Sequence, residues 1–353
     1  MIKTTVVGSF PKPDYLNIPD WFKPGGLGGK FNIKDYSNYY KNLPSEHEYK
    51  LIRSIKEIIE YHDNIGIDIV TDGEVRREHY INYFLRFLDG IDFENLSEIS
   101  SRGNAYKHLA PTVRSKVKPV GFFLSNDFKV AQMFTKKDVK ITIPGPMTIY
   151  DTICNKYYKD KYNLLDDLST AISYEVYNLV LSGCKHIQID EPLFARKPEE
   201  TLEYGIKYIE KCFEKVDKNV VKYLHICCGY PDKLNETDYP KADKDSYLKI
   251  AESIDNSCID VVSIEDAHCH NNLEELLPKF KKIGVMLGLI SISNTRIETV
   301  EEIEGRINEA LKYIDRSRLV VAPDCGLGML PKNIIDKKLK NMVSAVKNIN
   351  VLN

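Results

Sequence analysis

Residues 186–227 read HIQIDEPLFARKPEETLEYGIKYIEKCFEKVDKNVVKYLHIC, and this stretch decides which fold the chain can adopt. It begins with a short β-type run at 186–190, continues through a helix-like segment at 201–215, and ends with a second β-type run at 222–227. A crossover of this length joins two parallel strands of one sheet. The stretch therefore predicts a strand–helix–strand unit, and the rest of the chain repeats it.

Runs of β-branched and apolar residues that end in polar, Gly or Pro positions give eight strand candidates. They lie at 5–10, 67–72, 139–143, 186–190, 222–227, 259–265, 285–292 and 319–323. Most are continuous rather than alternating, which is typical of parallel strands that are covered on both faces. Helix-like stretches separate them at 45–65, 166–182, 201–215, 246–254, 272–280, 299–314 and 331–349.

This alternation of strands with helices predicts an α/β fold, namely a (β/α)8 TIM barrel, with a doubly wound sheet as the alternative. We interpret residues 1–353 as a single (β/α)8 barrel catalytic domain with two excursions. The first, 11–44, is a long loop after strand one and contains the glycine-rich stretch 24–29. The second, 74–138, is an insertion after strand two that is too long for one crossover helix. Such excursions often cover an active site.

The composition excludes several classes of partner. Lys and Arg number 49 against 51 Asp and Glu, a net charge of −2, so no positive field exists to attract nucleic acid or anionic lipid. No apolar run of about 18 residues occurs, and the first residues do not resemble a signal peptide. We therefore expect a cytoplasmic protein with small-molecule partners and with its eight cysteines reduced. The oligomeric state is not indicated.

Side chains that can bind a metal lie at the ends of three predicted strands. His225 and Cys227 end the fifth strand, Glu265 ends the sixth, and Cys325 follows the eighth. In a (β/α)8 barrel the carboxyl ends of all strands meet at one face, where catalytic groups gather. Alternation along an extended strand places His225 and Cys227 on the same side. We therefore expect all four side chains to meet at one centre.

One imidazole, two thiolates and one carboxylate form a tetrahedral set that suits zinc. A ligand that can leave, which we take to be Glu265, would open a position for a substrate. A zinc-bound thiol is deprotonated yet still nucleophilic, whereas a free thiol is mostly protonated at neutral pH. The predicted chemistry is therefore the activation of a substrate thiol for alkyl transfer.

The metal interpretation has structural alternatives. A His-x-Cys pair alone is weak evidence, because cysteine is among the most buried residue types. Glu265 and Cys325 at equivalent strand ends strengthen it. His268, Cys269 and His270 form a rival metal group just beyond strand six, although their close spacing in a loop favours an exposed segment.

Taken in order, several motifs resemble the cobalamin-independent methionine synthase family, in particular its C-terminal catalytic barrel. The motifs are VGSFP at 7–11, DGE at 72–74, PGPMT at 144–148, IQIDEP at 187–192, HIC at 225–227, IE at 264–265 and PDCGL at 323–327. Because the motifs are spread over nearly the whole chain, the resemblance is specific and is not limited to one segment.

The resemblance implies the same four zinc ligands that the strand ends predict. It also implies that the backbone of Gly8 and Ser9 binds the carboxylate of homocysteine, while Glu74 and Asp190 bind its amino group. Strand-end amides suit an anion, and two carboxylates suit an ammonium. We take Asp190, together with Glu265, as catalytic. Individually, the same residues could form only turns or helix caps.

The chain also departs from the family in ways that bear on the methyl donor. Full-length members have a second, N-terminal barrel, so this chain of 353 residues resembles a short, single-barrel branch. Folate-using members place a pterin-stacking tryptophan shortly after the Gly-Pro-x-Thr motif, but the matching residues 149–152 read IYDT, and the only tryptophan is Trp21. The histidine that protonates the leaving folate is missing from 291–295. The thiol half of the site is retained, and the folate half is not.

The sequence thus predicts a zinc-dependent methyltransferase that converts homocysteine to methionine. Its expected donor is not a folate but a methylcorrinoid, which a corrinoid protein could deliver, or another small methyl carrier. One alternative is a zinc alkyltransferase or lyase of the epoxyalkane:coenzyme M transferase type, in which Arg77 or Arg296 would bind a sulfonate. The other is a metal-free barrel of the uroporphyrinogen decarboxylase type, or a binding protein without catalysis.

Overall fold

The computed structural model describes residues 1–22, 33–101, 106–231, 233–236, 241–243 and 245–351. Eight strands form one sheet in the order β1-β11-β10-β9-β8-β7-β5-β2, and all neighbouring pairs are parallel. A bridge between Thr5 and Ile69 joins the two edges, so the sheet closes on itself. The predicted (β/α)8 barrel is confirmed, and the doubly wound alternative is wrong.

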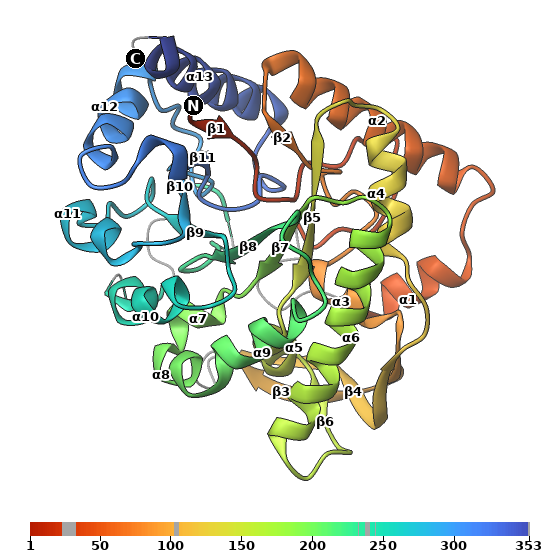
Figure 1. The fold of residues 1–353 in the computed structure, drawn as a ribbon. Coiled ribbons are helices and arrows are strands. Elements are labelled where there is room, and N and C mark those ends of the chain that lie inside the picture. The colour runs from red at the N-terminus through yellow and green to blue at the C-terminus, as the bar shows by residue number, and fades with distance from the viewer. Residues whose placement is uncertain (23–32, 102–105, 232, 237–240, 244, 352–353) are drawn as a thin grey trace.

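Helices cover the outside of the barrel (Figure 1). The barrel strands are β1 (Lys3–Thr4), β2 (Ile69–Val70), β5 (Asp138–Pro144), β7 (His186–Asp190), β8 (Val221–Ile226), β9 (Val261–Glu265), β10 (Gly284–Ile290) and β11 (Leu319–Pro323). The helices are α1 (Ile33–Lys41), α2 (His47–Ile65), α3 (Tyr80–Leu85), α4 (Leu124–Gln132), α5 (Pro146–Thr152), α6 (Lys161–Leu181), α7 (Leu193–Arg196), α8 (Pro198–Glu200), α9 (Ile206–Cys212), α10 (Ser246–Asp255), α11 (Leu273–Leu276), α12 (Val300–Ala310) and α13 (Lys332–Val351). Three short η turns lie at Thr201–Gly205, Leu277–Lys279 and Arg316–Arg318.

The first strand differs from its prediction. Strand β1 is only Lys3–Thr4, whereas the apolar run at 5–10 had suggested a longer strand. Val7 and Phe10 are buried, yet the chain leaves the sheet after the closing bridge at Thr5. The run is therefore apolar because it lies buried at the end of the barrel, not because it pairs with a neighbouring strand.

Both excursions contain regular structure. Residues 11–44 are not one long loop, because α1 occupies 33–41; the glycine-rich stretch 24–29 lies outside the described residues. The insertion at 74–138 folds as α3, an antiparallel pair of strands and α4. The paired strands are β3 (Leu88–Ser101) and β4 (Tyr106–Pro119), and the short strand β6 (Cys154–Asn155) adds to β4. This small sheet lies at the lower edge of Figure 1, beside α6.

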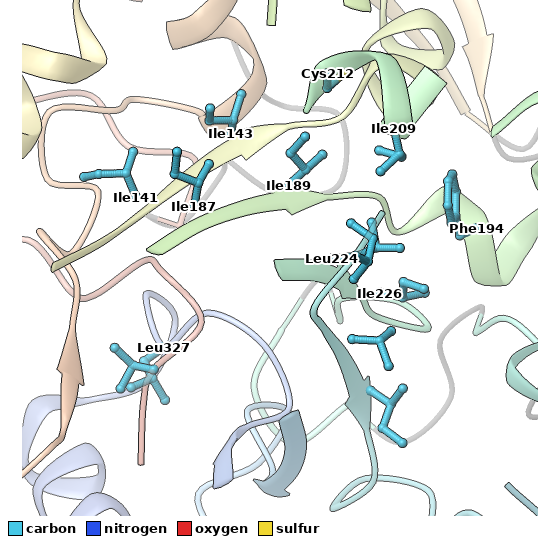
Figure 2. Close-up of a cluster of buried hydrophobic side chains, with 14 of the residues drawn as sticks. Ile141, Ile143, Ile187, Ile189, Phe194, Ile209, Cys212, Leu224, Ile226 and Leu327 are labelled. Atoms are coloured by element: carbon cyan, nitrogen blue, oxygen red, sulfur yellow. The ribbon is translucent and has the colours of Figure 1, made fainter. Parts of the chain in front are cut away.

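Alternation along the strands separates an apolar shell from a polar lumen. Figure 2 shows isoleucines of the barrel strands in one buried cluster with residues of the helix layer. The strand residues are Ile141 and Ile143 of β5 and Ile187 and Ile189 of β7, and the helix residues are Ile209 and Cys212 of α9. Burying such side chains supplies most of the stability of the fold, roughly 1.5–3 kcal/mol for each side chain. The alternate residues face inward and include polar side chains such as Lys140, Gln188 and His225, beside a small apolar cluster that contains Met286. Polar residues in the lumen are therefore available for binding and catalysis, while the apolar shell stabilises the fold.

Local signals fix several helix ends. Helix α2 ends at Gly66, whose φ of 96° suits a residue without a side chain. Helix α12 begins with a capping box, in which Thr299 and Glu302 bond to each other's backbone N–H. Among the described residues, no helix combines the length and the hydrophobicity that a membrane span requires.

Candidate metal centre and substrate site

The carboxyl ends of β8 and β11 bring three potential ligands together. His225 lies on β8, Cys227 follows two residues later, and Cys325 comes two residues after the end of β11. Their ligand atoms all lie within 4.8 Å of one another, and His225 Nε2 is 3.5 Å from Cys325 Sγ. Within the described ranges, this is the one cluster of three or more His, Cys, Asp or Glu that could hold a metal ion.

The distance between His225 and Cys325 is compatible with zinc. Tetrahedral zinc with bonds of about 2.0–2.3 Å places neighbouring ligand atoms about 3.3–3.8 Å apart. The His225–Cys325 distance of 3.5 Å falls in this range. Ser263 Oγ lies 2.8 Å from His225 Nδ1, so it fixes the ring with Nε2 toward the two sulfurs. Ser263 was missed from the sequence, although it precedes Glu265 by two residues on the same face of β9.

The two sulfurs differ in their protonation. A hydrogen bond from Cys325, together with one from His225, holds the pKa of Cys227 well below its usual range against the effect of burial. The same contact with Cys227, together with burial, raises the pKa of Cys325. A thiolate on Cys227 is the form in which cysteine binds a metal.

Glu265, the fourth predicted ligand, is close to this cluster but has other partners. Its Oε2 accepts a hydrogen bond from the backbone N–H of Cys228 at 3.1 Å, and its Oε1 pairs with Lys241. Burial raises its pKa, which Lys241 opposes and Cys227 reinforces. The structure therefore brings three of the four predicted ligands together, and the full set of four stays a prediction. Lys241 was not identified from the sequence.

Glu74 stands next to Gly8, as an amino-group site beside a carboxylate site would require. Glu74 Oε1 accepts a hydrogen bond from Thr142 Oγ1 at 2.6 Å. A Cβ atom on Gly8 would lie only 2.3 Å from that same oxygen, so only glycine fits there. Glu74 itself has a φ of 54°, in the left-handed region that non-glycine residues rarely adopt. Strain of this kind is concentrated at functional sites.

Asp190 ends β7 and belongs to the same neighbourhood. Its Oδ1 accepts a hydrogen bond from Gln188 Nε2 at 2.7 Å. Burial raises its pKa to about 7, an effect that His225 opposes and Glu74 reinforces. Asp190 thus interacts electrostatically with His225 of the metal cluster and with Glu74, the other residue predicted to bind the amino group.

Ser9 packs against the segment that carries Cys325. Its carbonyl accepts a hydrogen bond from the N–H of Leu327 at 2.8 Å. A Cβ on Gly326 would lie 2.1 Å from Ser9 Oγ, so the two backbones approach closely. The predicted carboxylate site at Gly8 and Ser9 therefore adjoins both Glu74 and the metal cluster, although its binding role stays a prediction.

Glu191 holds the PGPMT motif in place. Its Oε1 accepts from the N–H of Met147 at 2.8 Å, and its Oε2 accepts from the N–H of Thr148 at 3.0 Å. A carboxylate at the start of a helix satisfies N–H groups that have no partner within the helix. The alternative interpretation, that residues of the IQIDEP motif only cap a helix, therefore applies to Glu191. Asp190, in the same motif, faces the site.

A cluster of aromatic side chains lies beside the metal cluster. The ring of Trp21 is 5.8 Å from that of Tyr80 and 5.9 Å from that of Tyr230. The hydroxyl of Tyr230 donates to the carbonyl of Gly326 at 2.9 Å, next to Cys325. Trp21 is far from these residues in sequence, so sequence spacing gave no signal that it would approach the site.

The rival metal group does not assemble. Cys269 is exposed, the His270 side chain is 70% exposed, and His268 Nδ1 lies 2.8 Å from Ser293 Oγ. These three residues form no metal-binding cluster in the part of the chain that the structure describes. The interpretation of this segment as a loop fits its geometry.

Fold and site together define the class: a (β/α)8 barrel with a candidate metal centre at the carboxyl ends of its strands. The family model described as cobalamin-independent synthase, catalytic domain, matches residues 2–348. The chain therefore belongs to this family, as the motifs had indicated.

Individual relatives agree over the full length of the chain. The methionine synthase of Saccharolobus islandicus (strain Y.G.57.14 / Yellowstone #1) is 30% identical over 351 residues, covering 98% of this chain and 94% of the relative. A solved B12-independent methionine synthase from Shewanella sp. W3-18-1, in complex with selenomethionine, has a TM-score of 0.85 at 27% identity, covering 100% of this chain and 99% of that one. A putative vitamin-B12 independent methionine synthase from Listeria monocytogenes has a TM-score of 0.70 at 20% identity, covering 99% of each chain, and shows the fold alone.

Proposed function

We propose that the chain is a zinc-dependent methyltransferase that methylates homocysteine to methionine. The observation that carries this proposal is the approach of His225, Cys227 and Cys325 to within 4.8 Å at the carboxyl ends of the strands. Family membership and relatives named methionine synthase support methyl transfer to homocysteine. When bound, zinc would lower the pKa of a coordinated substrate thiol, so that a thiolate is present at neutral pH.

The chain's own residues would bind and orient the amino acid. The backbone N–H groups of Gly8 and Ser9 would donate hydrogen bonds to its carboxylate, and Glu74 and Asp190 would accept hydrogen bonds from its ammonium. Glu265 would act as the exchangeable fourth ligand, because Lys241 already pairs with its Oε1 and can hold it when the substrate thiol takes its place. These groups would place the thiol sulfur beside the histidine and the two cysteines, and the methyl donor would approach from the open side.

The methyl donor stays a prediction. The family is described as cobalamin-independent, so membership gives no support to a corrinoid protein as partner. The missing folate features still favour a non-folate donor, and Trp21 with its aromatic neighbours supplies an apolar surface near the site. The cytoplasmic location of the protein is likewise a prediction.

The geometry favours an amino-acid thiol over a sulfonate thiol. Arg296 pairs with Glu302, and its side chain is 60% exposed, so it does not line the site. Arg77 is buried, but its Nη1 lies 3.6 Å from Glu74 Oε1 and donates to Thr142. Against the effect of burial, Glu74, Asp72 and Asp127 act together to raise its pKa, so acidic groups already lie near it. A metal-free barrel of the decarboxylase type would leave the meeting of one histidine and two cysteines unexplained.

Purified protein loaded with zinc tests the proposal directly. We expect methionine, measured by mass spectrometry, when homocysteine is supplied with at least one of methylcobalamin, a methyltetrahydrofolate or a simple methylated thiol or amine. Cys325→Ser is the matched control and should give none. Failure to form methionine with every donor, from protein that holds zinc and binds homocysteine, would contradict the methyltransferase assignment.

A further inference from the structure

Lys140 lies in the lumen of the barrel on β5, and no function described above uses it. Its side chain is 0% exposed, and no carboxylate among the described residues lies within ion-pair distance of it. Its Nζ donates to Gln188 Oε1 at 2.5 Å and lies 3.9 Å from the sulfur of Met286. It also stands over the ring of Tyr223, 5.2 Å from the centroid. Burial lowers the pKa of Lys140 to about 7, and Asp190 and Glu74 oppose this shift from beyond ion-pair distance. Burying a lysine in this way costs stability, so stability alone does not explain its presence.

Lys140 determines which way the amide of Gln188 points. In its ammonium form Lys140 only donates hydrogen bonds, so it faces the amide oxygen rather than the amide nitrogen, as the contact with Oε1 shows. With Oε1 on Lys140, the Nε2 of Gln188 points to the other side. It donates to Asp190 Oδ1 at 2.7 Å and to the carbonyl of Val7 at 3.2 Å. A continuous chain of hydrogen bonds thus runs from the lysine to the aspartate.

The two carboxylates near the metal cluster are held in different ways. Glu74 has a cation close by, because Arg77 Nη1 is 3.6 Å from its Oε1, and Thr142 donates to the same oxygen. Asp190 accepts one hydrogen bond from the neutral amide of Gln188. The nearby cation, Lys140, contacts Gln188 rather than Asp190 itself. Among the described residues, none donates a hydrogen bond to the second oxygen of Asp190, Oδ2, which therefore remains available for a ligand with N–H donors.

We propose that Lys140 is a positioning residue for amino-group recognition: through Gln188 it orients Asp190 so that the free carboxylate oxygen faces the ammonium of an amino-acid thiol. This inference rests on the proposed function, because it requires a thiol substrate that carries an amino group. Lys140 contacts Gln188, Met286 and Tyr223, none of which is a predicted ligand of the substrate or the metal. Its removal should therefore change which thiols bind and leave the metal in place.

The test compares two thiols that differ only in the amino group, homocysteine and 4-mercaptobutanoate. Binding of each to zinc-loaded wild type and to Lys140→Met is measured by isothermal titration calorimetry. We expect the variant to bind homocysteine about tenfold or more weakly, equivalent to about 1.4 kcal/mol, with little change for 4-mercaptobutanoate. Asp190→Asn should show the same selective loss, and Gln188→Met serves as a second variant if Lys140→Met does not fold.

Lys338→Met is the matched control. Lys338 is also 0% exposed, but it pairs with Glu298 at 2.9 Å and has no contact with the site. Its loss should lower the melting temperature and leave the preference for homocysteine unchanged. The inference would be overturned, and the proposed function left intact, if Lys140→Met and Gln188→Met both kept the wild-type preference for homocysteine. The same would follow if both variants bound homocysteine and 4-mercaptobutanoate equally more weakly. Binding of neither thiol by zinc-loaded wild type would instead overturn the proposed function, and the inference with it.

Discussion

His225 and Cys325 are 100 residues apart in sequence, yet their side chains are 3.5 Å apart in space. They meet because His225 lies at the carboxyl end of β8 and Cys325 follows that of β11, and both ends lie at the same mouth of the barrel. Ser263 on the neighbouring strand fixes the imidazole. At the scale of single residues, the site therefore depends on alternation along strands and on a few orienting hydrogen bonds.

Single substitutions at the sulfur ligands should remove zinc without unfolding the protein. Cys227→Ser or Cys325→Ser replaces a thiolate by a hydroxyl that stays protonated, so zinc should fall from about one per chain to well below one. Metal content is measured by inductively coupled plasma mass spectrometry, and folding by circular dichroism. Loss of the folded state in both variants would show that the metal is structural rather than catalytic.

Gly8→Ala should damage the site without damaging the fold. The added Cβ would lie 2.3 Å from Glu74 Oε1, so Glu74 must move away from its position. We expect KM for homocysteine to rise about tenfold or more, because displacement of a positioned group commonly has effects of that size. The measurement is steady-state kinetics at saturating methyl donor.

The control for that change is Gly305→Ala on α12. Nothing lies within 4 Å of a Cβ at Gly305, and alanine favours the helix, so the variant should gain about 0.5–1 kcal/mol in unfolding free energy with unchanged KM. An unchanged KM in Gly8→Ala would show that Glu74 does not bind the substrate.

The sequence was sufficient for some site residues and insufficient for others. The spacing of His225 and Cys227 was readable, because strand alternation is a local rule. Lys241 could not be found, because it follows β8 on a loop whose path depends on tertiary packing. Trp21 was missed for the same reason. Lys140 and Gln188 did leave a signal, namely polar residues at every second position of otherwise apolar strands.

At the scale of elements, α6 and α4 meet around a buried acid. Glu175 on α6 accepts hydrogen bonds from the N–H groups of Phe123 and Leu124 at the start of α4, at 3.4 and 3.2 Å. Its Oε1 has no hydrogen-bond partner among the described residues. Burial raises the pKa of Glu175 from 4.5 to about 7.

This shift predicts a pH dependence of stability that a neutral substitute removes. Because the folded-state pKa lies above the unfolded one, the contribution of Glu175 is complete below about pH 4.5 and is lost as the pH rises through 7. Relative to Glu175→Gln, the unfolding free energy of wild type should fall by about 1–3 kcal/mol across this window. Urea denaturation at several pH values measures it, and parallel pH profiles of the two proteins would contradict the assignment.

Element prediction succeeded where periodicity decided the structure. Strands at 186–190 and 319–323 match their predictions, since each is a short buried run between polar ends. The run at 5–10 was wrong as a strand because burial at the mouth of a barrel and burial within a sheet give the same apolar pattern. The antiparallel strands β3 and β4 were not predicted, because they carry many polar residues; the sequence indicated only that the insertion at 74–138 is too long for one helix.

At the scale of the whole molecule, closure of the barrel rests on few contacts. Strands β1 and β2 have two residues each, and they meet through the Thr5–Ile69 bridge. Asp68 reinforces the closure, because its Oδ2 accepts from the N–H of Thr4 at 2.7 Å and from its hydroxyl at 2.9 Å. Near the same seam, Asn350 of α13 bonds to the backbone of Ile2, so the ends of the described chain lie together (Figure 1).

Asp68→Ala should therefore weaken the whole barrel. Two hydrogen bonds to a charged acceptor are lost, so we expect unfolding free energy to fall by about 1–3 kcal/mol. Asp89→Ala, at an exposed position of β3 outside the barrel, should change it by less than about 0.5 kcal/mol. Chemical denaturation of both variants measures the difference, and equal effects would show that the seam does not limit stability.

The central claim is that one zinc ion at His225, Cys227 and Cys325 binds the substrate thiol. X-ray absorption at the zinc edge, with and without homocysteine, tests it most directly, because it counts the sulfur ligands of the metal. We expect two sulfur ligands in the free protein and three when homocysteine is bound, with one nitrogen or oxygen ligand lost. A sulfur count that stays the same on saturation with homocysteine, or protein that cannot be loaded with zinc, would contradict the claim.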